Sequence, residues 1–245
     1  MESKGSSKGN IPTCHTNSLK MKVIEKYQNS DLNNSDVKWY LFDEQLWITK
    51  YEDYADIENS IANSVGSFNW LYELNDTVLF NKDTGRFETA IIGMVGRIRV
   101  DKCKEYSNLI KAGRKGDLFL AEKKNIDFEF LESVIYAENE DILYSYPAKY
   151  DNQENSIIFI VDDFGFVIVR HQLKGWFLKK ASEHVCVTRE YNKEITPHML
   201  ARYLNALKLW EEDEDETELK SLLEECKIKE DEFSCALREC IMNLL

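Results

Sequence analysis

Two neighbouring carboxylates are the first side chains in this sequence whose spacing suggests chemistry. Asp162 and Asp163 follow the apolar run SIIFIV, at the point where a strand would end. Adjacent carboxylates at a strand end often hold a divalent ion. Because neighbouring strand residues point to opposite faces of a sheet, only one of the two would face a given site. A hairpin turn therefore explains the pair better than a metal site does.

A histidine and a cysteine form the second candidate group. His184 and Cys186 are two positions apart, and His171 precedes them in the same β-rich region. On a strand, side chains at positions i and i+2 share a face, so a thiolate nucleophile could stand beside an imidazole base. No sequence signature of a catalytic thiol surrounds them, and neighbours on a strand explain the spacing equally well. Catalysis here is therefore an alternative and not the leading hypothesis.

The six cysteines predict neither a disulfide framework nor a metal centre. They are scattered along the chain and include no C-x-x-C pair, whereas zinc sites and disulfide-rich domains show closely spaced cysteines. Buried free thiols are the better interpretation. The sequence also lacks the G-x-S-x-G, H-E-x-x-H and dinucleotide-binding patterns. We therefore expect no metal and no cofactor.

The net charge of −13 is distributed unevenly. Residues 86–124 hold ten Lys or Arg against five Asp or Glu, whereas residues 125–163 hold one against ten. Residues 205–245 hold five against thirteen. A chain this acidic repels a phosphate backbone, so nucleic acid is disfavoured as a partner and a basic protein is favoured.

The densest acidic stretch has seven Asp or Glu among the eight positions from Glu211 to Glu218. Mutual repulsion disfavours a regular helix there, which predicts a hydrated connector between helices. The functional interpretation is that these acids present a negative field to a basic protein. The residues that we expect to face such a partner are Glu211, Glu212, Asp213, Glu214, Asp215 and Glu216, helped by Glu138, Glu140 and Asp141.

Strand patterns dominate the segment from residue 21 to residue 195 that must position these side chains. A short strand or helical turn is predicted in residues 21–28, and two strands are predicted around Asp43 and Glu44. Residues 52–66 predict a helix, because apolar side chains recur every three or four positions up to Gly66. Further strands are expected near Trp70–Leu74, Val78–Phe80 and Phe87–Val100, with a hairpin turn at NKDTG.

Two further strand predictions complete this segment. GDLFLA, starting at Gly116, predicts a strand. Residues 155–191 predict two strands about Asp162–Gly165, a turn at Lys174–Gly175 and one or two strands after it. Gly93 and Gly96 suggest a bulge or a close backbone approach in the long strand before them.

Helices are expected at the C-terminal end of the chain. Thr196 is the predicted N-cap of a helix that has Pro197 at its first position and continues to Trp210. After the acidic connector, residues 217–228 and 230–245 predict a helical hairpin.

The expected fold class is α+β, with largely antiparallel sheets and a C-terminal helical region packed on one face or end. We divide the chain into a flexible tail (1–20), a β-rich domain (21–195) and a helical segment (196–245) packed on that domain.

The leading functional hypothesis is a non-catalytic, acidic interaction protein that binds and blocks a basic protein. An immunity protein against a nuclease toxin, or an inhibitor from a mobile element, would have this composition.

We expect a cytoplasmic location, because the chain has neither an apolar run of about 20 residues nor a secretory signal. The first alternative is a hydrolase or transferase acting on a phosphorylated or nucleotide ligand, bound by the basic segment Arg97–Lys124. Its candidate catalytic residues are Asp162, Asp163, His171, His184 and Cys186. A second alternative is self-association through the C-terminal helices.

Overall fold

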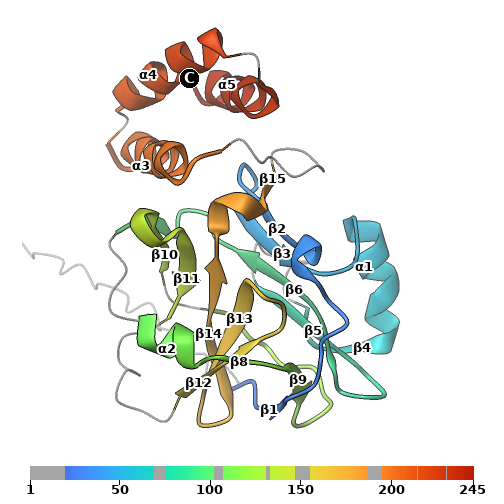
Figure 1. Ribbon diagram of the computed structural model, residues 1–245. Coiled ribbons are helices and arrows are strands. Elements are labelled where there is room, and N and C mark those ends of the chain that lie inside the picture. The colour runs from blue at the N-terminus through green and yellow to red at the C-terminus, as the bar shows by residue number, and fades with distance from the viewer. Residues whose placement is uncertain are drawn as a thin grey trace, which may run out of the picture.

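Two facing β-sheets and a layer of helices across one end of them make up the fold (Figure 1). The computed structural model describes residues 20–68, 76–101, 107–130, 133–146, 155–186, 195–213, 215–229 and 231–245. It confirms the predicted α+β class, with mostly antiparallel sheets followed by C-terminal helices. Residues 1–19 of the predicted tail and the strand predicted near Trp70–Leu74 lie outside the described residues.

The two large sheets consist of short strands rich in β-branched and aromatic residues. The described strands of the seven-stranded sheet, in spatial order, are β7 (Ile98–Val100), β10 (Val134–Ala137), β11 (Ile142–Ser145), β14 (Gln172–Lys179), β13 (Phe164–Val169), β12 (Asn155–Phe159) and β8 (Arg114–Lys115). Those of the six-stranded sheet are β15 (Val185–Cys186), β2 (Val37–Tyr40), β3 (Gln45–Ile48), β6 (Phe87–Gly93), β5 (Thr77–Asn81) and β4 (Ser64–Phe68). Within these two sheets, β7–β10, β8–β12 and β2–β15 are parallel pairs.

The edges of both sheets are short or covered. The edge strands β8 and β15 have two residues each, and β7 has three. The edge strand β4 is longer, but a neighbouring segment runs beside it. Ile126 N donates to Gly66 O over 2.9 Å, and Ser67 Oγ donates to Phe128 O over 3.0 Å.

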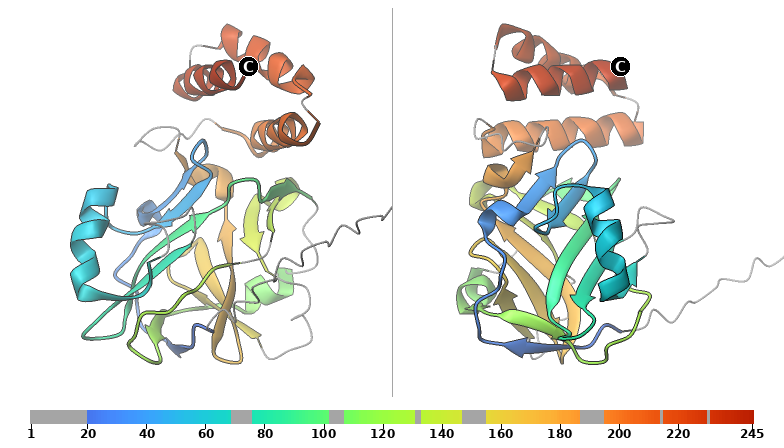
Figure 2. Two further views of the ribbon diagram at one scale, coloured as in Figure 1. Left: turned by 180° about the vertical axis from the view of Figure 1, so that it is seen from behind. Right: turned by 90° about the vertical axis from the view of Figure 1, so that its right-hand side faces the viewer.

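A two-stranded ribbon joins the sheets at the end away from the helices (Figure 2). Its antiparallel strands are β1 (Val23–Lys26) and β9 (Asp117–Leu120). On one side, Val23 N donates to His171 O over 2.8 Å, which attaches β1 to the hairpin between β13 and β14. On the other side, Leu120 N donates to Gly85 O over 2.8 Å, which attaches β9 to the hairpin between β5 and β6. The ribbon therefore fixes the two sheets to each other at this end.

The main hydrophobic core lies between the two sheets. The ring centroids of Trp39 in β2 and Tyr136 in β10 are 6.1 Å apart, and those of Phe87 in β6 and Phe166 in β13 are 5.2 Å apart. Each pair joins one sheet to the other, and all four side chains are buried. Aromatic pairs of this kind add to the stabilisation that comes from burial of apolar surface.

Each large sheet also has a helix on its outer face. α1 (Tyr54–Ser60) places Ile57 in the hydrophobic cluster outside the six-stranded sheet. α2 (Ser107–Ala112) places Leu109 and Ile110 against the cluster outside the seven-stranded sheet. Buried residues on both faces explain why several of these strands are continuously apolar and do not alternate with polar residues.

The C-terminal layer consists of α3 (Pro197–Asp213), α4 (Thr217–Ile228) and α5 (Glu232–Leu244). The predicted cap of α3 is confirmed, because Met199 N donates to Thr196 Oγ1 over 3.2 Å. Leu200, Tyr203 and Leu204 of α3 are buried in the main core. This face of α3 therefore packs on one end of the sheets, as the sequence predicted.

The helical hairpin of α4 and α5 stacks on the side of α3 that faces away from the sheets (Figure 2). Arg202 of α3 donates to Glu218 and Glu225 of α4, each over 2.7 Å. Tyr203 OH lies 3.8 Å from Cys240 Sγ of α5. Polar contacts thus add to the apolar packing that holds this helical cap together.

The helix predicted up to Gly66 is shorter than expected. α1 ends at Ser60, a 3-10 turn η2 (Ile61–Asn63) follows, and Gly66 lies inside β4. Gly66 has a φ of 131°, and a Cβ added there would collide with the carbonyl oxygen of Val78 on β5. The glycine is therefore explained by the close approach of two strands and not by a helix end.

Two predictions about the later strands were also wrong. The predicted turn at Lys174–Gly175 lies inside β14, and the chain reverses instead at Arg170 and His171. The long strand expected over Phe87–Val100 is divided into β6 and β7, which belong to different sheets. Gly96, with a φ of 63°, lies in the turn that separates them.

A buried carboxylate holds this crossing between the sheets in place. Asp76 is fully buried and accepts hydrogen bonds from Gly93 N over 3.0 Å and from Phe130 N over 2.5 Å. Arg97 lies close to it, with Nη1 3.9 Å from Asp76 Oδ1, and also donates to Gly93 O over 3.0 Å. Asp76 thus connects the end of β6, the turn after it and the segment that contains Phe130.

Replacing Asp76 with alanine should destabilise the protein strongly. Asp76→Ala leaves two buried N–H groups without an acceptor and Arg97 without its counter-charge, so we expect a loss of about 3–5 kcal/mol. Asp76→Asn keeps one acceptor oxygen and should lose less. Urea denaturation of both variants measures the difference. A loss below about 1 kcal/mol for the alanine variant would contradict this role.

Candidate functional site

The first part of the predicted acidic connector is helical, whereas Asp215 and Glu216 lie between α3 and α4. α3 continues through Glu211 and Glu212 to Asp213, so the expectation that repulsion would prevent a regular helix was wrong for this part of the block. The apolar face of α3 is buried against the sheets, and this burial outweighs the repulsion, which is worth only tenths of a kcal/mol per pair. The acids therefore lie in the last turn of α3, where the helix dipole already has its negative end.

Several acids in and next to this block are bound within the helical cap. Asp215 Oδ1 accepts from Thr217 N over 2.9 Å at the start of α4, where the helix dipole favours negative charge. Glu216 pairs with Lys220 over 2.5 Å, and Glu212 lies 3.6 Å from Lys208. These contacts give the acids a structural role within α3 and α4. The side chains of Asp213 and Glu214 lie outside the described part of the chain.

Glu211 differs from its neighbours in the block. Its side chain is exposed and makes no hydrogen bond or ion pair with any residue that the structure describes. Its charge acts on Glu44 in the turn between β2 and β3, where Glu44 adopts a left-handed backbone conformation with a φ of 47°. Glu44 O accepts from Met94 N over 2.7 Å, and its carboxylate accepts from Gly96 N over 3.0 Å. These hydrogen bonds fix the turn, which lies on the α3 side of the sheets (Figure 1).

Glu44 and Glu211 influence each other electrostatically. Burial raises the pKa of Glu44 to about 7, against a hydrogen bond from Gly96 that lowers it, and the charge of Glu211 adds to the increase. The neighbouring Asp43 is exposed and unpaired among the described residues. We call Asp43, Glu44 and Glu211 the acidic junction. It combines residues that are far apart in the sequence, so no local pattern could have identified it.

The other acids that we nominated lie elsewhere. Glu138 belongs to the 3-10 turn η4 (Glu138–Glu140) and its carboxylate contacts His198 Nδ1 over 2.9 Å at the start of α3. Glu140 is exposed. Because Glu211 is thirteen positions after His198 along α3, the two acidic groups are about 20 Å apart. A partner would have to span the length of α3 to contact both.

The carboxylate of Asp141 accepts three hydrogen bonds from other residues of the protein. Its carboxylate accepts from Ser182 Oγ over 2.7 Å, from Ser182 N over 3.0 Å and from Tyr136 OH over 2.9 Å. These contacts attach η6 (Ala181–His184) to the turn before β11. The geometry therefore gives Asp141 a structural role in the fold.

Among the candidate catalytic residues, the structure brings Asp163 and His184 together. His184 Nε2 is 3.4 Å from Asp163 Oδ2, and Asn34 Nδ2 donates to the same carboxylate oxygen over 2.8 Å. Both members of the pair are buried. Burial alone would raise the pKa of Asp163, but the nearby His184 imidazole and the charge of Lys180 together lower it. The pair anchors the 3-10 turn η1 (Asn34–Asp36) to the seven-stranded sheet.

The remaining catalytic candidates do not join that pair. His184 lies in η6 and Cys186 in β15, so they do not occupy one strand as expected. Burial raises the pKa of Cys186 to about 11, which keeps the thiol protonated and unreactive at neutral pH. Asp162 is exposed and pairs with Lys115, and His171 lies in the β13–β14 turn beside β1. The five residues therefore form no common site.

The basic segment Arg97–Lys124 is also dispersed. Arg97 is used at the buried crossing near Asp76, Lys124 pairs with Glu122 over 2.5 Å, and Arg114 lies over the ring of Tyr27. Within the described ranges, no group of three or more His, Cys, Asp or Glu side chains could hold a metal ion. No described helix is long and apolar enough to cross a membrane.

Comparisons with known proteins leave the function to be argued from the geometry. No family model matches the sequence, and no curated protein or solved structure shows significant similarity to it.

The raised pKa of Glu44 predicts that stability depends on pH through this residue. A carboxyl group whose pKa is about 7 in the folded state, against an ordinary value of 4.5, destabilises the fold progressively as the pH rises from about 4.5 to 7. Glu44→Gln should therefore raise the melting temperature at pH 8 by about 2–4 °C, or about 1 kcal/mol after allowance for partial exposure. At pH 5 the gain should be small.

Thermal unfolding of the wild type and Glu44→Gln at both pH values tests this expectation. Asp76 is also buried with a pKa raised to about 7, so only the difference between the two proteins isolates Glu44. Asp43→Asn, which removes a neighbouring exposed charge, controls for the general effect of net charge. An equal gain for Glu44→Gln at pH 5 and pH 8 would show that its carboxylate is not destabilised in the fold.

Proposed function

We propose that this protein is an acidic cytoplasmic interaction protein that binds and blocks a basic protein partner through the acidic junction. One observation supports the proposal above the others: the charge of Glu211, at the negative end of α3, acts on the half-buried Glu44, and Glu211 forms no ion pair with any residue that the structure describes. Most of the other acids at the two ends of α3 have a structural partner. The acidic junction is the exception.

A cationic partner would relieve three unfavourable effects at once. It would offset the repulsion between Glu44 and Glu211, the negative end of the α3 dipole and the burial that raises the pKa of Glu44. An Arg side chain suits this position, because its planar guanidinium can bind two carboxylates through separate N–H groups. The net charge of −13 would add long-range attraction and speed association at low salt.

Blocking follows from the same charge pattern. A basic protein that acts on nucleic acid has a cationic surface for the phosphate backbone, and a rigid array of carboxylates can occupy that surface. An immunity protein that neutralises a nuclease toxin, or an inhibitor from a mobile element, would work in this way. The hydrolase or transferase alternative is less well supported, because its candidate residues do not converge. Self-association through α4 and α5 stays a prediction that light scattering can test.

Neutralising the acidic junction should weaken binding to a cationic probe. We would measure the affinity of a deca-arginine peptide for the wild type and for Asp43→Asn/Glu44→Gln/Glu211→Gln at about 50 and 150 mM salt. The triple variant should bind about tenfold more weakly at low salt, with a reduced dependence on salt. A control with the same change in charge is Glu52→Gln/Asp56→Asn/Glu58→Gln, in and just before α1. It should lose less than about threefold.

Blocking is tested with basic proteins encoded by genes beside this one. The wild type should bind one of them and inhibit its activity, and the acidic-junction variant should lose that inhibition while the α1 control keeps it. Equal weakening of the peptide by both triple variants would show that only net charge matters. Inhibition that survives in the acidic-junction variant would place the blocking surface elsewhere.

A further inference from the structure

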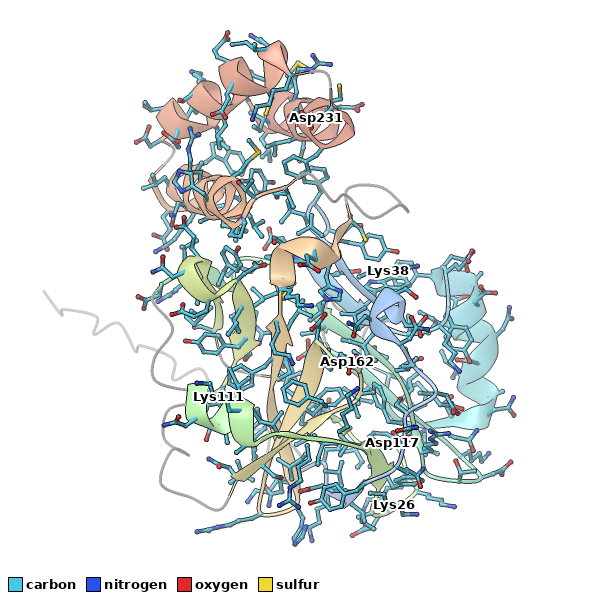
Figure 3. All side chains as sticks on the ribbon, in the orientation of Figure 1. Lys26, Lys38, Lys111, Asp117, Asp162 and Asp231 are labelled. Atoms are coloured by element: carbon cyan, nitrogen blue, oxygen red, sulfur yellow. The ribbon has the colours of Figure 1, made fainter. Side chains whose placement is uncertain are left out.

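A groove lined by aromatic, apolar and basic side chains lies at the end of the molecule opposite the helical cap. The cavity has a volume of about 470 Å³. It lies between β1 on one side and the start of β12, the end of β13 and the β13–β14 turn on the other. We call it the basal groove; its lining includes Ile24, Glu25, Tyr27, Ser156, Arg170 and His171. Figure 3 shows Lys26 of β1 at this end and Asp231 of the helical cap at the other. The groove is thus far from the acidic junction.

An exposed aromatic ring forms one part of the basal groove. Tyr27 is 63% exposed and Ile24 is 49% exposed, which is unusual for large apolar side chains beside a cavity. The guanidinium carbon of Arg114 lies 5.4 Å from the centroid of the Tyr27 ring. An aromatic ring next to a cation offers a stacking surface for a flat, electron-rich group such as a nucleobase.

An arginine and a histidine form the second part. Arg170 and His171 are exposed, and neither side chain makes a hydrogen bond or ion pair with another described residue. Among the six lining residues named above, the one acid is Glu25, and its carboxylate accepts from Ser156 Oγ over 2.8 Å. An anionic group would therefore meet unpaired donors at Arg170 and His171. Arginine is well suited to phosphate because its N–H groups match two phosphate oxygens.

The backbone that carries Arg170 and His171 is strained. Arg170 and His171 have φ values of 50° and 62°, and they form the two-residue turn between β13 and β14. Such turns favour Asn–Gly, because residues with a Cβ are disfavoured at positive φ. Strain of this kind is concentrated at functional sites. His171 O also accepts from Val23 N over 2.8 Å, so the turn is fixed relative to β1 and Tyr27.

We propose that the basal groove binds a mononucleotide, with the base stacked on Tyr27 and the phosphate held by Arg170 and His171. The cavity volume lies within the range of small-molecule sites. A small anion is the appropriate ligand, because the net charge of −13 repels a long polyanion, whereas one phosphate responds mainly to the local cations. This proposal is independent of the proposed function, since it uses the opposite end of the molecule.

Calorimetric titration with AMP tests the proposal. The decisive variant is Arg170→Asn/His171→Gly, which removes both phosphate contacts and installs the residues that this turn prefers. Its melting temperature should be equal to or higher than that of the wild type, while its affinity for AMP should fall at least about tenfold. Tyr27→Leu should lower the affinity several-fold. The matched control Lys82→Asn, which removes one charge from the β5–β6 turn, should bind AMP as the wild type does.

The other ligands separate the contributions of base and phosphate. Adenosine and inorganic phosphate should each bind more weakly than AMP, and binding of adenosine should depend on Tyr27. Failure of the wild type to bind AMP at millimolar concentration would overturn the proposal. So would unchanged affinity in Arg170→Asn/His171→Gly, equally tight binding of inorganic phosphate, or tighter binding of a single-stranded oligonucleotide than of AMP. Neutralising the acidic junction should leave AMP binding unchanged, so the two proposals can fail separately.

Discussion

The structure depends on one buried carboxylate at the point where the chain crosses between the sheets. Asp76 is fully buried, and it binds the backbone at Gly93 and Phe130 while lying beside Arg97. The turn from Gly93 to Arg97 takes the chain out of the six-stranded sheet and into the seven-stranded sheet. Burial raises the pKa of Asp76 to about 7, and the charge of Arg97 and the hydrogen bonds from Phe130 N and Gly93 N oppose this increase. The crossing is thus held by polar contacts inside an apolar core.

The position of the acidic junction follows from that crossing. The same turn supplies Met94 N and Gly96 N to Glu44, and these donors fix the β2–β3 turn beneath the end of α3. Packing of Tyr203 and its neighbours in the core then brings Glu211 to this turn. At the far end, the ribbon of β1 and β9 fixes the basal groove in a comparable way. The fold thus separates an acidic end from a cationic, aromatic groove.

The sequence predicted the fold class and most elements, because strand and helix patterns are local. Thr196 and Pro197 predicted the start of α3 correctly, and NKDTG predicted the hairpin between β5 and β6. The errors arose where tertiary packing overrode local preference. Gly66 resembles a helix end but lies where two strands approach closely, and Arg170–His171 forms a turn that its residue types disfavour. The acidic junction was not predictable, since Glu44 and Glu211 meet only after the sheets and α3 have packed.

The short edge strands have a consequence for the behaviour of the protein at high concentration. An exposed edge of a sheet can pair with another chain and begin aggregation. Here β7, β8 and β15 offer two or three residues each, and β4 is covered by the segment from Ile126 to Phe128. The described edge strands therefore offer few free backbone groups with which a strand of another molecule could pair.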